Sequence, residues 1–232
     1  MKHSLIKILS LESEVEKGKR LKECSRIFLS VLAIHIIFTT IGLIAAKFDL
    51  YIKSKHPNSV LIENTEDWQA LFLIFFSSTI IHPLTEELSF RFSNSIQSNQ
   101  VLLGFCFMSA FVLTLFFDLN ELLFTAKIPF SLFIIGLGLA TYLLLRIVVP
   151  QHKFSTSGLF IIIILSNLVF ALVHLNVNST QENLLGYFII LFPFFFVGCL
   201  YSYARITMGF SYAFLCHAMN NGFFFFLNLI MK

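Results

Sequence analysis

Seven long apolar stretches limit the chain to one kind of fold. A helix that crosses a lipid bilayer needs ~20 mostly apolar residues, and stretches near that length recur along all 232 residues. They lie at 27–47, 68–92, 101–117, 129–149, 154–175, 184–203 and 211–231. Because only short polar segments connect them, the sequence predicts an all-α fold, a polytopic transmembrane helical bundle of about seven spans.

The composition favours the same fold class and excludes others. The residues are 57% hydrophobic and only 12% charged, which is too little charge for the surface of a soluble domain. The 30 phenylalanines are typical of long apolar helices rather than of a β-barrel with alternating polarity. The net charge of +3 forms no basic stripe, so we expect membrane lipid as a partner and no nucleic acid. The four scattered cysteines show no spacing that indicates disulfides or a thiolate zinc site.

The N-terminal residues differ from the rest of the chain. Residues 1–26 are rich in lysine and predict a basic, amphipathic helical segment at the membrane surface. Residues 27–232 are expected to form a single transmembrane domain. Because lysine and arginine gather in the N-terminal tail, the positive-inside rule places the N-terminus in the cytoplasm.

The apolar stretches contain a few ionisable residues, each of which costs at least ~2.5 kcal/mol inside a bilayer. The strongest cluster follows Pro83, where Glu86, Glu87 and Arg91 end an apolar run. On a helix Glu87 and Arg91 are i,i+4 neighbours that can neutralise each other. Glu86 points about 100° away and has no such partner. The cluster is therefore either a salt-bridge cap of a helix end or a site whose free carboxylate is Glu86.

Two further apolar stretches carry histidine. His174 ends the run that begins near residue 154, and a lone histidine there also fits ordinary packing. His217 and Asn221 share one helix face by their i,i+4 spacing, as either a polar pocket or a hydrogen-bonded pair between helices. His35 and His82 show no set of partners and are expected to be structural.

These polar residues together supply what peptide hydrolysis requires: an activated water, a proton carrier and donors for the oxyanion. Glu86 is the candidate general base, with His174 sharing the water or returning the proton. His217 and Asn221 are the candidate oxyanion donors, and Glu87 with Arg91 supports Glu86. A zinc ion held by His174, His217 and Glu86 is the alternative. We expect no cofactor, because a neutral amide such as that of Asn221 is a poor zinc ligand but a good oxyanion donor.

Three motifs stand in order on separate apolar stretches: EExxxR at 86–91, FxxxH at 170–174 and HxxxN at 217–221. Together they resemble the CPBP family, the CAAX proteases and bacteriocin-processing enzymes, also called the Abi or type II CAAX endopeptidases. The resemblance implies an intramembrane endopeptidase with its core at about 83–221. It implies the roles given above for the motif residues, a prenylated or leader- or bacteriocin-type peptide, or a lipidated protein, as substrate, and a bacterial plasma membrane.

Two other functions stay open, namely a non-catalytic peptide- or partner-binding protein of the same fold, with an immunity or scaffold role, and a small transporter. The chain also departs from the family pattern, since two apolar stretches separate EExxxR from FxxxH and Phe92 follows the arginine in place of a glycine. Straight spans would place Glu86 and His174 at opposite membrane faces. The hydrolase interpretation therefore predicts a break at Pro83, with Glu86 on a re-entrant or tilted segment.

Overall fold

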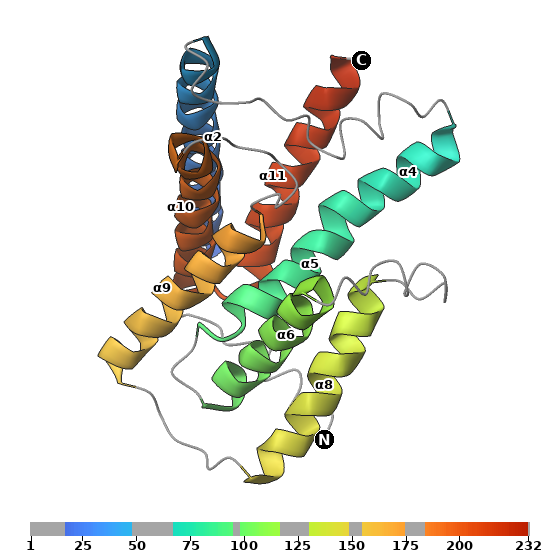
Figure 1. Cartoon of the computed structure of the whole chain (residues 1–232), viewed down its shortest axis with the longest axis vertical. Coiled ribbons are helices and arrows are strands. Elements are labelled where there is room, and N and C mark those ends of the chain that lie inside the picture. The colour runs from blue at the N-terminus through green and yellow to red at the C-terminus, as the bar shows by residue number, and fades with distance from the viewer. Residues whose placement is uncertain are drawn as a thin grey trace.

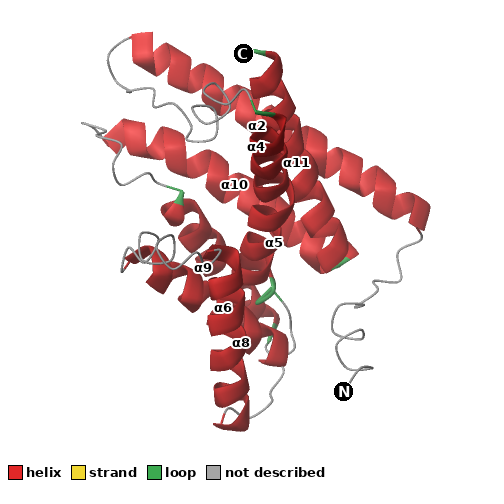
Figure 2. Ribbon diagram, turned by 90° about the vertical axis from the view of Figure 1, so that its right-hand side faces the viewer, coloured by secondary structure: helices red, strands yellow, loops and turns green. Residues whose placement is uncertain are grey.

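The computed structural model describes residues 17–47, 67–94, 98–116, 130–148, 155–174 and 184–231, and all the elements within them are helical (Figure 2). The elements are α2 (Lys17–Lys47), α4 (Trp68–Phe76), η1 (Ser77–Ile81), α5 (His82–Glu86), η2 (Glu87–Arg91), α6 (Ser98–Phe116), α8 (Phe130–Val148), α9 (Thr156–Val173), α10 (Leu184–Met208) and α11 (Phe210–Ile230). The π-helical turns η1 and η2 continue α4 and α5 without a gap, so the described residues form seven helices. The predicted all-α class is confirmed.

Four of these helices are long and apolar enough to cross a membrane. They cover Leu21–Ala45, Trp68–Arg91, Gly186–Met208 and Phe210–Ile230, whereas α6, α8 and α9 contain shorter apolar stretches. Large apolar side chains are exposed on the outside of the molecule, as expected where lipid replaces water. The four long helices indicate an integral membrane protein.

The first helix begins earlier than the sequence predicted. α2 runs unbroken from Lys17 to Lys47, so residues 17–26 of the expected surface segment form the first turns of the spanning helix. Lysine, arginine and glutamate are good helix formers, and nothing in this stretch ends a helix. The rest of the predicted segment, residues 1–16, lies outside the described residues.

The predicted break at Pro83 is absent, and the helix passes through the proline by way of π-turns. Pro83 lies in the first turn of α5, and its ring has no N–H to donate. The preceding residue, His82, donates its backbone N–H to Ser77, five residues back. With the same five-residue spacing, the backbone carbonyl of Ser78 would accept from residue 83, but Pro83 has no N–H to donate. The side-chain amide of Asn221 donates to that carbonyl instead, at 3.0 Å. The helix therefore stays continuous to Arg91.

The position of α9 removes the need for a re-entrant segment. α9 has only 18 residues, and its C-terminal end meets α5 and α11 in the middle of the bundle rather than at a surface (Figure 1). The prediction treated every apolar stretch as a full span, whereas the apolar part of α9, Ser157–Val173, is shorter than the four long helices. His174, which follows α9 directly, thereby reaches the level of Glu86.

Two apolar cores hold this arrangement. One joins α2, α10 and α11 around Val31, Tyr201 and Cys216. The other packs α6, α8 and α9 against η2 around Phe90 and Phe170. The charged residues of η2 lie between these cores, because Phe90 belongs to one of them while the neighbouring Arg91 faces Tyr201 of the other.

Candidate active site

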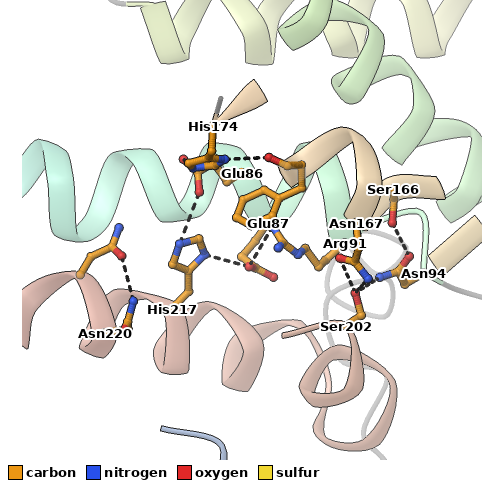
Figure 3. Close-up of polar contacts among 12 residues, drawn as sticks. Glu86, Glu87, Arg91, Asn94, Ser166, Asn167, His174, Ser202, His217 and Asn220 are labelled. Atoms are coloured by element: carbon orange, nitrogen blue, oxygen red, sulfur yellow. Dashed lines mark hydrogen bonds and ion pairs between the residues drawn. The ribbon is translucent and has the colours of Figure 1, made fainter. Parts of the chain in front are cut away.

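Three helices bring the predicted glutamate and histidines together (Figure 3). Glu86 is the last residue of α5, His174 caps α9 and His217 lies within α11. The Glu86 carboxylate faces both rings, with Oε1 3.8 Å from His174 Nε2 and Oε2 3.4 Å from His217 Nε2. The structure thus brings together three of the four residues to which the sequence assigned catalysis.

Glu87 makes a closer contact than the one predicted for it. Its Oε1 lies 3.8 Å from Arg91 Nη1, so the expected ion pair is present, and both side chains are completely buried. The nearer partner is His217, whose Nδ1 is 2.9 Å from the same oxygen. Residue spacing along one helix indicated Arg91 but carried no signal for this contact between helices.

His217 therefore lies between two carboxylates. Its Nδ1–H donates to Glu87, and its Nε2 faces Glu86. The two carboxylates, the His217 ring and the Arg91 guanidinium lie within contact of one another. Because a buried ionisable group without a partner costs several kcal/mol, these contacts favour the clustering of the four side chains.

The two histidine rings are held by aromatic side chains of α10. The His217 ring stacks on Tyr201 with centroids 4.5 Å apart and planes 20° apart, and the His174 ring stacks on Phe194 at 4.2 Å and 24°. The second ring nitrogen of His174 is also fixed, since Nδ1 lies 2.7 Å from the Phe170 carbonyl oxygen. An Nδ1–H that donates there leaves Nε2 of the neutral ring as an acceptor facing Glu86.

Phe170 also explains the first residue of the FxxxH motif. The Arg91 guanidinium lies over the Phe170 ring, with Cζ 3.7 Å from the centroid. Gly198 of α10 leaves the space for it, because a Cβ at this position would lie 3.1 Å from Arg91 Nη2. The nitrogens of Arg91 have no hydrogen-bond partner among the described residues. The aromatic face and the more distant Glu87 carboxylate compensate its charge.

The members of the cluster differ in exposure. The side chains of Glu86 and His174 are 15% and 23% exposed, whereas those of Glu87 and Arg91 are at 0%. Glu86 and His174 are therefore the more accessible members, and the Glu87–Arg91 pair is enclosed by the protein.

Asn221 takes a different place from the one predicted for it. It shares the α11 face with His217, but its Nδ2 donates to the Ser78 carbonyl across the helix interface. No hydrogen bond among the described residues joins it to Glu86, His174 or His217. Its visible role is to hold α11 against η1 at the proline turn.

A second polar cluster lies deeper between η2, α9 and α10, and the sequence did not single it out. Ser202 accepts hydrogen bonds from Asn94 at 2.8 Å and from Asn167 at 2.9 Å, and Ser166 donates to Asn94 at 3.3 Å. All four residues are buried. Ser166 and Asn167 were noticeable as polar residues of an apolar run, but nothing in the sequence indicated their partners.

The sequence allowed a zinc ion, held by His174, His217 and Glu86, as the alternative to a metal-free site. A zinc ion needs its nitrogen and oxygen ligands at about 2.0–2.2 Å in a tetrahedral arrangement. Among the described residues, no group of three or more His, Cys, Asp or Glu side chains is arranged to hold a metal ion. The set of His174, His217 and Glu86, as placed, does not fit zinc.

Comparison of the chain with protein-family models, with curated proteins and with solved structures found no match.

Proposed function

We propose that the chain is an intramembrane endopeptidase in which Glu86 and His174 activate water to cleave a membrane-associated peptide. The observation that carries this proposal is the Glu86 carboxylate between His174 Nε2 and His217 Nε2, at 3.8 and 3.4 Å. The three residues come from three helices, and each is costly to bury alone. The order of the motifs EExxxR, FxxxH and HxxxN, which resembles that of the CPBP family, supports the same reaction.

The gap between Glu86 and His174 suits a water molecule. A separation of 3.8 Å is too long for a direct hydrogen bond but allows a water that both groups contact. In the proposed reaction the water oxygen attacks the carbonyl carbon of the peptide bond while Glu86 accepts a water proton. Glu86 or His174 then gives that proton to the leaving nitrogen. The C–N bond breaks, and a carboxylate and an amine are released.

His217 is the proposed donor to the oxyanion. Its Nδ1–H is held by Glu87 at 2.9 Å, which fixes the plane of the ring and leaves Nε2 directed at the reacting side of Glu86. A proton on Nε2 can be shared with the Glu86 carboxylate at rest and with the developing oxyanion during attack. Asn221 supports this geometry as a positioning residue, by fixing α11 to Ser78.

The proposed setting is a bacterial plasma membrane with the N-terminus in the cytoplasm. All seven helices lie within the membrane in this proposal, with α6, α8 and α9 as its shorter members. In this proposal the Glu86–His174 pair cleaves within the bilayer, and substrates reach it from the lipid. Prenylated, leader-type and bacteriocin-type peptides share this membrane association.

The test compares peptide termini released by the wild-type chain and by Glu86→Gln. Each protein is reconstituted in liposomes together with bacterial membrane proteins that have not been proteolysed. New N-termini are then identified by mass spectrometry. We expect new termini from the wild-type chain and a loss of about 10²–10⁴-fold in Glu86→Gln. Glu23→Gln, which makes the same change at a carboxylate paired with Arg26 on α2, serves as the control and should leave cleavage unchanged. Equal termini from wild type and Glu86→Gln would refute the proposal.

A further inference from the structure

Two of the four cysteines meet where α2 packs against α11. The Sγ atoms of Cys24 and Cys216 are 2.7 Å apart, and Cys216 Sγ also lies 3.9 Å from the Cys24 carbonyl oxygen. Both residues carry free thiols. They are 192 positions apart in the chain, so no spacing in the sequence indicated that they form a pair.

The apolar core around the two sulfurs keeps them in contact. On α2, Cys24, Ile27 and Val31 recur at the spacing of one helix face, and all three are buried in this core. On α11, Ala213 and Cys216 lie one turn apart in the same core. Because a close-packed core resists rotation of either helix, the two thiols remain neighbours.

The two sulfurs need little movement to bond. An S–S bond is about 2.05 Å long, so they would approach each other by roughly 0.7 Å. Well-ordered atoms of a folded protein already move by about 0.5 Å along each axis. Cys199 has a different neighbour, since its sulfur accepts a contact from Asn167 Nδ2 at 3.7 Å. Cys24 and Cys216 are therefore described thiols that are placed to bond each other.

Cys24 lies at the edge of the hydrocarbon rather than in its middle. The apolar part of α2 begins at Leu21, and the side chains of Glu23 and Arg26, which flank Cys24, form an ion pair and are 31% and 60% exposed. Charged groups of this kind stay near water because hydrocarbon excludes them. The thiols themselves are buried, with Cys24 2% and Cys216 1% exposed. Local opening of the first turns of α2 therefore admits a molecule of nearly the size of water before it admits a large thiol reductant.

We propose that Cys24 and Cys216 are a peroxide-sensitive thiol pair that forms a disulfide between α2 and α11. One thiol sulfur attacks an oxygen of hydrogen peroxide, the O–O bond breaks, and a sulfenic acid and water result. The second thiol then attacks the sulfenic sulfur, the S–O bond breaks, and a disulfide and a second water form. The pair gives up two hydrogens and two electrons to one peroxide. Thiols at a cytoplasmic surface are kept reduced otherwise, and a disulfide that forms there on oxidation is typical of redox sensing.

The disulfide would cross-link the first span to the helix that carries His217. Cys216 directly precedes His217, whose ring is held by Glu87 and Tyr201 through contacts that involve neither cysteine. The cross-link therefore leaves those contacts in place. It closes a loop of about 190 residues and restricts the unfolded chain, so the oxidised protein resists unfolding more than the reduced protein. This inference does not depend on the proposed peptidase function.

The test counts the free thiols of the full chain in lipid nanodiscs before and after treatment with hydrogen peroxide. Remaining thiols are alkylated with N-ethylmaleimide in denaturant, and the mass of the intact chain gives the number of adducts. We expect the wild type, with its four cysteines, to fall from four adducts to two, and a non-reducing digest to yield one linked pair of peptides that contains Cys24 and Cys216. Cys24→Ser should keep its three remaining thiols. Cys199→Ser, the same change outside the pair, should fall from three to one.

Two outcomes of the count would overturn the inference. A wild type that keeps all four thiols, while glutathione in the same sample is oxidised, would show that the pair does not respond to peroxide. A disulfide that involves Cys106 or Cys199, or that joins two copies of the chain, would show that the contact between α2 and α11 is not the one that reacts.

A second measurement on the wild type does not depend on how well a variant folds. Unfolding in mixed detergent should shift to higher denaturant after peroxide treatment, and the shift should disappear when dithiothreitol is added to the unfolded chain before refolding. Cys24→Ser should show no shift with peroxide. A shift of equal size in Cys24→Ser would assign the effect to another oxidation and would contradict the proposed cross-link.

Discussion

Two polar clusters lie near each other in the bundle, one joining α5, α9 and α11 around Glu86 and the other joining α9, α10 and Asn94 around Ser202, and they differ in charge, exposure and contact distances (Figure 3). The network of Asn94, Ser166, Asn167 and Ser202 is neutral, buried and closed by hydrogen bonds among its own members. The cluster around Glu86 consists of ionisable side chains and is partly exposed, and the Glu86 carboxylate lies 3.4 and 3.8 Å from the two histidine rings, longer than usual hydrogen bonds.

The comparison distinguishes polar groups that join helices from the polar groups to which the proposed function assigns the reaction. A closed neutral network satisfies its own polar groups and joins helices, at about 0.6 kcal/mol for an average hydrogen bond between transmembrane helices. Buried ionisable groups are a costly way to join helices, and such groups are candidates for chemistry, which is the role that the proposed function gives to the Glu86 cluster. Four substitutions test this distinction, and we take them in order of expected effect.

The largest effect is expected at His174. His174→Gln should lower cleavage about 10²–10⁴-fold because it removes the acceptor facing Glu86. Stability should change little, since the ring is at the end of α9 and partly exposed. His82→Gln is the control, a histidine of the Glu86 helix whose Nε2 lies 3.5 Å from the Ser77 hydroxyl. Similar losses in both variants, measured by release of new termini, would show that His174 has no special role.

Arg91→Met should reduce stability by ~3–5 kcal/mol, because it leaves the buried Glu87 carboxylate without its guanidinium. The double variant Glu87→Leu with Arg91→Met should recover much of this loss, since a buried ion pair can often be replaced by apolar groups. Reversible unfolding in mixed detergent measures both variants. A single variant as stable as wild type would mean that the pair carries no charge in the folded protein.

Tyr201 tests the aromatic support of the histidines. Tyr201→Leu removes the ring stacked on His217, worth roughly 0.5–1.5 kcal/mol beyond its buried area, whereas Tyr201→Phe keeps it. We expect cleavage and the nitrogen NMR shifts of His217 to change in the leucine variant and to be close to wild type in the phenylalanine variant. Equal changes in both would assign the effect to the Tyr201 hydroxyl instead.

The smallest effect is expected in the neutral network. Ser202→Ala removes the shared hydroxyl and should cost about 1 kcal/mol, the usual size for such a group, with no change in cleavage per folded molecule. Thermal unfolding and the terminus assay measure the two quantities. A large loss of cleavage with unchanged stability would mean that the network belongs to the site and that the comparison fails.

The sequence predicted the helices well, because apolar length is a direct signal of a membrane helix. It predicted the end of α2 at Lys47 and a helix in the N-terminal residues, but not that residues 17–26 continue without a break into the apolar part of α2. Lysine, arginine and glutamate favour a helix as much as the apolar residues do, so propensity marks no boundary there. The sequence also predicted a break at Pro83. The missing N–H is compensated there by Asn221, which lies 138 positions later in the chain and which no local pattern indicates.

The sequence indicated the residues of the site because a polar side chain is energetically costly in an apolar stretch, and it did not indicate their contacts. Glu86, His174 and His217 stand out as polar groups in apolar stretches, and so their meeting could be expected. The bond between His217 and Glu87 and the stacking on Tyr201 depend on helix rotation, which the sequence does not specify. The FxxxH motif marks Phe170 but not its contact with Arg91, and with 30 phenylalanines no pattern could distinguish Phe194 from ordinary packing residues.

The most direct test of the central claim is whether Glu86 and His174 act as one unit. Cleavage rates are measured for Glu86→Gln, His174→Gln and the double variant in the same liposomes. Groups that share one step are strongly non-additive, so we predict that the double variant is about as slow as the slower single variant. Losses that multiply in the double variant would show two independent contributions, and they would contradict a reaction carried by the Glu86–His174 pair.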